Sequence, residues 1–101
     1  MSYQINHQGD HIFVSLSNEI YVEHASSFRE ALLPYLEKGH KNFILDLSSL
    51  NYIDSSGLGV LIGIQKKAFT NSGRVVIKGL KGQVKELFEL TRLTKIFEII
   101  E

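Results

Sequence analysis

The stretch NFILDLSSLNYIDSSGLGVLIG, residues 42–63, decides the fold of this chain of 101 residues. Its first six residues are an apolar run broken by Asp46, which is typical of a strand covered on both faces. We expect backbone N–H groups of the neighbouring loop to satisfy that carboxylate. Residues 48–52 are predicted to form this loop. From Asp54 to about Asn71 the pattern is helical, and the first half is apolar on all sides, which indicates a buried helix.

Alternating side chains predict a hairpin at the start of the chain. Residues 3–16 alternate apolar and polar types on either side of Gly9 and Asp10, the pattern of two antiparallel strands joined by a tight turn. The period then changes to helical spacing over residues 24–38. Pro34 lies inside that helix and cannot donate a backbone hydrogen bond, so we expect a kink or an early break there.

Three shorter elements follow the central strand and helix. They are predicted as a strand, a helix and a last short strand, at residues 74–78, 81–93 and 96–100. Strands that alternate with helices pair in parallel, because each crossover returns the chain to the same end of the sheet. We therefore expect an α/β fold in a single domain covering residues 1–101. Its small sheet is mostly parallel, begins with an N-terminal antiparallel hairpin and has helices packed on it.

The composition excludes several classes of protein. Lys plus Arg number 11 and Asp plus Glu number 11, so no net charge favours nucleic acid or an anionic membrane surface. No cysteine is present, which excludes disulfides and thiolate metal sites and suits a reducing compartment. The first residues are unlike a signal peptide, and the apolar run of residues 57–64 is too short to span a bilayer. We expect a soluble cytoplasmic protein without a cofactor, a membrane partner or direct contact with nucleic acid.

Two kinds of ligand site lack their sequence signature. The stretch GLGVLI has Ile62 where a dinucleotide fingerprint needs glycine, and no G-K-S/T ending is present that would complete a phosphate-binding loop. The histidines are His7, His11, His24 and His40, and they lack the spacing of metal ligands. We therefore expect neither a nucleotide loop nor a metal centre.

The sequence DSSG at residues 54–57 allows two interpretations. In the first, Asp54 caps the helix by accepting a hydrogen bond from the N–H of Ser56 or Gly57, worth about 1 kcal/mol over alanine. In the second, a first-turn serine carries a phosphate, which adds about −1.5 to −2 charges beside the free donors and positive dipole of the helix start. Asp54 would repel that phosphate, and a partner docking here would have to desolvate it. Capping and switching both remain open on these residues alone.

Glycines near the start of this helix lower its stability, so their presence requires an explanation. Gly57 and Gly59 each cost about 1 kcal/mol relative to alanine in a helix. Bare backbone permits close approach of the sheet or of another protein, so the pair favours a helix end that something approaches. Gly63 extends the same small face, and packing of the helix on the sheet explains Gly63 at least as well.

The residues NFILDLSSLNYIDSSGLGVLIGIQKKA strongly resemble the central signature of the STAS domain. More narrowly, they resemble bacterial anti-sigma factor antagonists, in which a D-S-S/T-G-L-G block follows a hydrophobic strand and opens a helix. The resemblance extends over nearly the whole chain, including the hairpin and the alternation of helices and strands. It implies the STAS fold and a regulatory module rather than an enzyme.

The resemblance implies a switch operated by phosphate. In the family, the serine directly after the motif aspartate accepts a phosphate from a serine protein kinase, often the anti-sigma factor itself, and a cognate phosphatase removes it. By position that serine is Ser55. The unphosphorylated form binds the anti-sigma factor, or partner-switching kinase, and frees the sigma factor for transcription.

The resemblance also implies a partner surface made by two segments. The partner-binding residues it implies are Glu19, Ile20, Tyr21, Asp54, Ser55, Ser56, Gly57 and Leu58. The family commonly has G-E-L-D before its first helix, whereas this chain has NEIY at residues 18–21, with Tyr21 in place of an acid. The alternative function is a STAS binding module that is never phosphorylated, for example the soluble subunit of a lipid transporter. In that case Ser56 and Gly57 serve packing and docking, and Ser55 stays unmodified.

Overall fold

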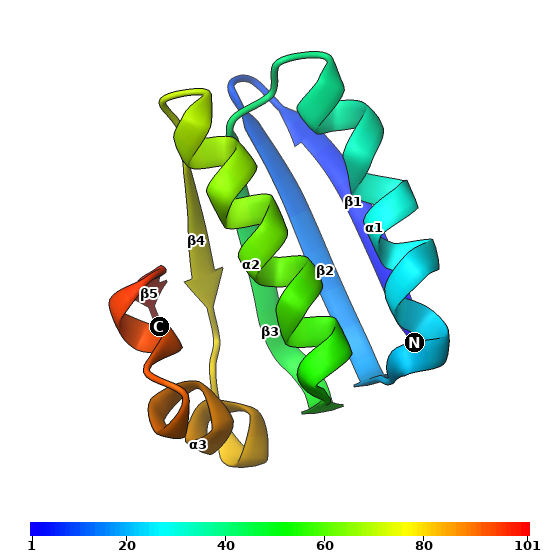
Figure 1. Ribbon diagram of the computed structural model, residues 1–101, viewed down its shortest axis with the longest axis vertical. Coiled ribbons are helices and arrows are strands. Elements are labelled where there is room, and N and C mark those ends of the chain that lie inside the picture. The colour runs from blue at the N-terminus through cyan, green and yellow to red at the C-terminus, as the bar shows by residue number, and fades with distance from the viewer.

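The computed structural model describes all residues, 1–101, as one five-stranded sheet with three α-helices and a short 3-10 helix (Figure 1). The elements in chain order are β1 (Ser2–Gln8), β2 (His11–Ile20), α1 (Val22–Glu37), β3 (Asn42–Ile53), α2 (Ser55–Thr70), β4 (Arg74–Lys78), α3 (Gly82–Leu90), η1 (Leu93–Lys95) and β5 (Glu98–Ile100). The strands lie side by side in the same order as in the chain. β1 pairs with β2 antiparallel and every other pair is parallel, so the predicted fold class is confirmed.

Both long helices lie on one face of the sheet. Figure 1 shows α1 and α2 side by side across the strands, with α3 beyond the carboxyl ends of β3 and β4. Successive strands are added in one direction, so two right-handed crossovers place α1 and α2 on the same side. Val14 and Leu45 point under the helices and are fully buried, whereas Ile44 on the opposite face is only half-buried. The expectation that β3 is covered on both faces is therefore wrong.

β3 is twice as long as predicted. Residues 48–52, expected to be a loop, continue the strand to Ile53 and pair with β2. At each of two register shifts, β3 has one residue more than β2. The buried side chains of β3 therefore occur every third residue, at Leu47, Leu50 and Ile53. Such bulges break the alternation that identifies a strand in a sequence. They bring the end of β3 level with Ile20, the last residue of β2.

The first helix continues through its proline. α1 ends at Glu37, so the early break expected at Pro34 is not found. Pro34 lies in the last turn, is exposed, and still accepts a hydrogen bond at its carbonyl from the Lys38 N–H at 3.1 Å. The proline therefore removes only one backbone hydrogen bond from the helix, the one that its missing N–H would donate. Gly39, with φ of +92°, then ends the helix in a conformation that suits glycine.

Asp46 lies on the face of the sheet that the helices leave open. Its carboxylate accepts a hydrogen bond from the Ser48 N–H at 2.9 Å, so a backbone donor is confirmed, although Ser48 belongs to β3 rather than to a loop. Partial burial raises the pKa of Asp46, but the hydrogen bonds from Ser48 and the charge of Lys78 outweigh it. Together they hold the pKa of that carboxyl below its ordinary value.

The last elements are shorter than predicted. α3 ends at Leu90 because Arg92 takes a left-handed conformation with φ of +61°, and η1 follows. β5 begins at Glu98, two residues later than expected. Leu93 and Phe97, between these elements, are buried in the core, so this segment closes the domain through side-chain packing.

Candidate functional site

The two predicted site segments meet at the carboxyl ends of β2 and β3. Glu19 pairs with Tyr52 and Ile20 with Ile53 across the two strands. The Asp54 N–H then donates a hydrogen bond to the carbonyl of Ile20 at 3.0 Å. The end of β2 and the start of α2 are therefore held side by side by backbone bonds, as the parallel sheet requires.

Asp54 caps α2 as the first interpretation predicts. Its backbone is extended, and its Oδ1 accepts a hydrogen bond from the Gly57 N–H at 3.1 Å. The Leu58 N–H makes the first bond within the helix, to the Asp54 carbonyl at 3.0 Å. The N–H groups of Ser55 and Ser56 remain as the donors of the first turn that this cap does not use.

The two serines of the first turn differ in exposure. Ser55 is exposed and Ser56 is half-buried. A phosphate on Ser55 would lie in water beside the positive end of the α2 dipole. One on Ser56 would have to be partly desolvated against the domain itself. The geometry thus makes Ser55 the more accessible acceptor, while its modification remains a prediction.

Gly57 is required by the packing of α2 on the sheet. A Cβ at this position would lie 2.6 Å from Cγ1 of Ile53 and 2.8 Å from Cγ2 of Ile20. This chain therefore fills the space beside Gly57 with its own side chains. Ile20 is fully buried and Leu58 is 6% exposed, so neither residue presents much surface to a partner. Glu19 and Tyr21 have exposed side chains at this end.

Gly59 and Gly63 face away from the sheet. A Cβ built at either position meets no atom within 4 Å, so packing of the helix on the sheet does not explain Gly63. Both glycines line a hollow of about 220 Å³ between α1 and α2, with Arg29 and Leu33 on the other side. No close contact at the Cβ position therefore requires glycine at either site.

Aromatic rings join the two segments of the site. Tyr21 precedes α1, and its N–H donates to Nδ1 of His24 at 3.0 Å. The Tyr21 ring lies 5.4 Å from the Tyr52 ring, centroid to centroid. Sequence reasoning missed Tyr52 and His24. Tyr52 was assigned to a loop, and no pattern in the sequence indicates that it pairs with Tyr21. The Glu19 carboxylate raises the pKa of the Tyr21 phenol, because it accepts a hydrogen bond from the neutral phenol and repels the phenolate.

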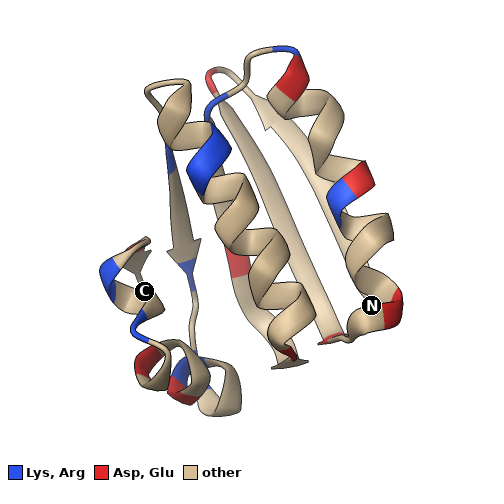
Figure 2. Ribbon diagram, viewed as in Figure 1, with Lys and Arg blue, Asp and Glu red and all other residues tan.

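The charged residues of the two site segments near Ser55 are all acidic. Glu19, Glu23 and Asp54 lie at the end of β2 and at the starts of α1 and α2 (Figure 2). Residues 11–28 and 42–65 contain no lysine or arginine. A phosphate here would therefore find backbone donors but no cation within these two segments.

Other kinds of site are not formed. No group of three or more His, Cys, Asp or Glu side chains could hold a metal ion. None of the helices combines the length and the apolar character needed to cross a membrane. The two predicted segments together form a capped helix start with an exposed serine beside the end of β2.

The class of protein follows from two features, a sheet with both long helices on one face and the capped start of α2 at the carboxyl ends of the strands. The family model of the STAS domain matches residues 2–101, and the chain belongs to the STAS domain family. The anti-sigma-B factor antagonist of Listeria monocytogenes is 37% identical over 90 residues, which cover 89% of this chain and 79% of that protein. The anti-sigma-B factor antagonist of Staphylococcus aureus is 28% identical over 88 residues, which cover 87% of this chain and 82% of that protein.

Solved structures agree with this fold. The Thermotoga maritima protein TM1081 superposes with a TM-score of 0.92 at 26% identity, covering 98% of this chain and 86% of that one. The Bacillus cell fate determinant SpoIIAA in its phosphorylated form superposes with a TM-score of 0.80 at 17% identity. That match covers 99% of this chain and 92% of the SpoIIAA chain, and it shows the shared fold.

Proposed function

We propose that this chain is an anti-sigma factor antagonist switched by phosphorylation of Ser55. Unphosphorylated, it binds an anti-sigma factor or partner-switching kinase in the cytoplasm, and a cognate phosphatase reverses the modification. The observation that carries the proposal is the exposed Ser55, one residue after the capping Asp54, at a helix start formed by segments, residues 11–28 and 42–65, that contain no lysine or arginine. The relationship to anti-sigma-B factor antagonists supports it.

The charge distribution indicates how a phosphate would act. A phosphoserine orders or docks a segment when an arginine or lysine is near, because the charged pair forms strong hydrogen bonds. The neighbouring charges of the two site segments are Glu19, Glu23 and Asp54, so no such pair forms within those segments. The domain keeps its fold, and the phosphate acts on the partner instead. A partner covering Ser55 would have to desolvate about two negative charges, which is costly.

Phosphate mapping tests the modification. The purified protein is incubated with Mg-ATP and the anti-sigma factor kinase encoded in the same genome, and the phosphate is located by mass spectrometry. We expect phosphate on Ser55, none on the Ser55→Ala variant and normal phosphorylation of the matched Ser56→Ala variant. Phosphate found only at Ser56, or no phosphate with any kinase of that genome, would refute the proposal that phosphorylation of Ser55 controls this protein.

Binding measurements test its consequence. Ser55→Ala should retain the affinity of the unmodified protein for the anti-sigma factor, whereas Ser55→Asp should weaken it. Isothermal titration calorimetry with the purified anti-sigma factor gives both dissociation constants. Equal binding by the two variants would mean that charge at this helix start does not control the partner.

A fixed binding module is the second candidate. The acidic surroundings that repel a phosphate and the burial of Gly57 against Ile20 and Ile53 favour a surface that is never modified. The partner would then be a subunit of another assembly, such as a lipid transporter. Transporter genes beside this gene, together with an unmodified Ser55 in protein purified from its native cells, would favour this candidate.

A further inference from the structure

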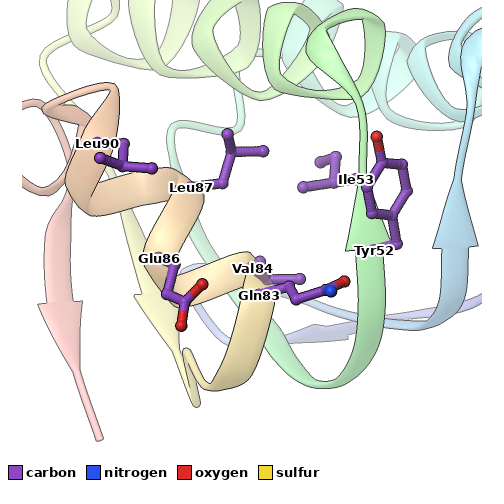
Figure 3. Close-up of a pocket in the computed structure, with 7 residues that line it drawn as sticks. All are labelled: Tyr52, Ile53, Gln83, Val84, Glu86, Leu87 and Leu90. Carbon is purple, nitrogen blue, oxygen red and sulfur yellow. The ribbon is translucent and has the colours of Figure 1, made fainter.

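A cleft of about 220 Å³ lies between α3 and the carboxyl end of β3 (Figure 3). Tyr52 and Ile53 line one side, and Val84, Leu87 and Leu90 of α3 line the other. Figure 3 shows Val84 and Leu87 on the side of α3 that faces β3. The chain runs directly from Ile53 into Asp54 and Ser55, so the cleft adjoins the proposed switch.

Apolar surface around this cleft is left in water. Leu90 is 81% exposed and Tyr52 is 40% exposed. The Tyr52 ring also lies 5.4 Å from the Tyr21 ring, so a second exposed aromatic side chain adjoins the cleft on the side of the loop before α1. Covering such a patch with a partner's side chains is favourable, because it removes apolar area from water.

The two sides of α3 differ in charge. Glu86 is the one charged residue that lines the cleft. Lys81, Lys85 and Glu89 line a separate hollow on the side of β5. The charged residues of the two segments that flank Ser55 are also acidic, so the cleft and the helix start carry charge of the same sign beside an apolar lining. A basic partner surface that carries an apolar side chain complements it.

We propose that this cleft is the second half of the surface that receives the anti-sigma factor. It takes one apolar side chain of that partner, with a lysine or arginine of the partner opposite Glu86. The inference rests on the proposed function and adds a separate source of affinity to it. The cleft contributes affinity for the partner, and phosphorylation of the adjoining Ser55 prevents the partner from contacting the start of α2.

Paired substitutions on exposed residues test the cleft. Leu90→Ser removes the exposed apolar side of the cleft, and Phe69→Ser is its control, because Phe69 is 73% exposed near the end of α2. Glu86→Lys reverses the cleft charge, and Glu89→Lys makes the same change on the other side of α3. Dissociation constants for the purified anti-sigma factor encoded in the same genome are measured by calorimetry at low and high salt.

The expected pattern separates the cleft from the rest of the surface. Leu90→Ser should weaken binding by about tenfold or more, the effect of losing one buried leucine contact. Glu86→Lys should weaken binding and reduce its dependence on salt. Phe69→Ser and Glu89→Lys should stay within about twofold of the parent protein, as exposed changes outside an interface do. Thermal melting followed by circular dichroism checks that every variant is folded.

Three outcomes overturn the inference. Normal affinity in both Leu90→Ser and Glu86→Lys removes the cleft from the interface, even where Ser55→Asp still weakens binding and the proposed function stands. An unmodified parent protein that does not bind the anti-sigma factor refutes the proposed function and the cleft with it. A dimer seen by analytical ultracentrifugation and abolished by Leu90→Ser would assign the cleft to a second copy of this chain.

Discussion

Two glycines of α2 should respond in opposite directions to alanine. At Gly57 the new Cβ would lie 2.6 Å from Cγ1 of Ile53 and 2.8 Å from Cγ2 of Ile20, and both isoleucines are buried. Their branched side chains have little rotamer freedom, so relief requires a shift of α2 or of the strand ends. Overpacking of this kind costs about 1–3 kcal/mol, against a gain of about 1 kcal/mol from helix propensity.

Gly59 provides the matched control. A Cβ there meets nothing within 4 Å, so only the propensity gain remains and Gly59→Ala should stabilise the domain by up to about 1 kcal/mol. The net effect of Gly57→Ala should be a loss of up to about 2 kcal/mol. Urea unfolding followed by circular dichroism measures both, and each kcal/mol corresponds to about 4 °C or more in Tm for a domain of this size. A Gly57→Ala variant at least as stable as its parent would refute the assignment of Gly57 to packing.

Two further predictions concern the aspartates Asp54 and Asp46. Asp54→Ala should lower the free energy of unfolding by about 1 kcal/mol through loss of the bond to the Gly57 N–H, whereas Asp54→Asn should retain most of the cap; equal losses in urea titrations would contradict a capping role. The pKa of Asp46 is lower in the folded chain than in an unfolded one, so the ionised carboxylate stabilises the fold above the ordinary carboxyl pKa. That contribution disappears as the pH falls through the folded pKa. Asp46→Asn should therefore be less stable than its parent at pH 7 and approach it in acid, and a constant difference across this range would contradict the hydrogen bonding described for Asp46.

Local patterns in the sequence determined the elements and the cap of α2. Alternation on either side of Gly9 marked the hairpin, and the change to helical period marked α1. The capping interpretation of Asp54 is confirmed, because its carboxylate accepts a hydrogen bond from the Gly57 N–H. These features depend on neighbours within a few residues, so a single sequence contains the physical information they require.

Only the tertiary structure decided what each residue of the candidate site faces. The extension of β3 depends on pairing with β2 through two bulges, and Tyr52 meets Tyr21 only because that pairing exists. The glycines of α2 look alike in sequence, yet Gly57 is enclosed by Ile20 and Ile53 while Gly59 is open. Burial and contact across strands are set by residues distant in the chain, and periodicity within one segment does not contain them.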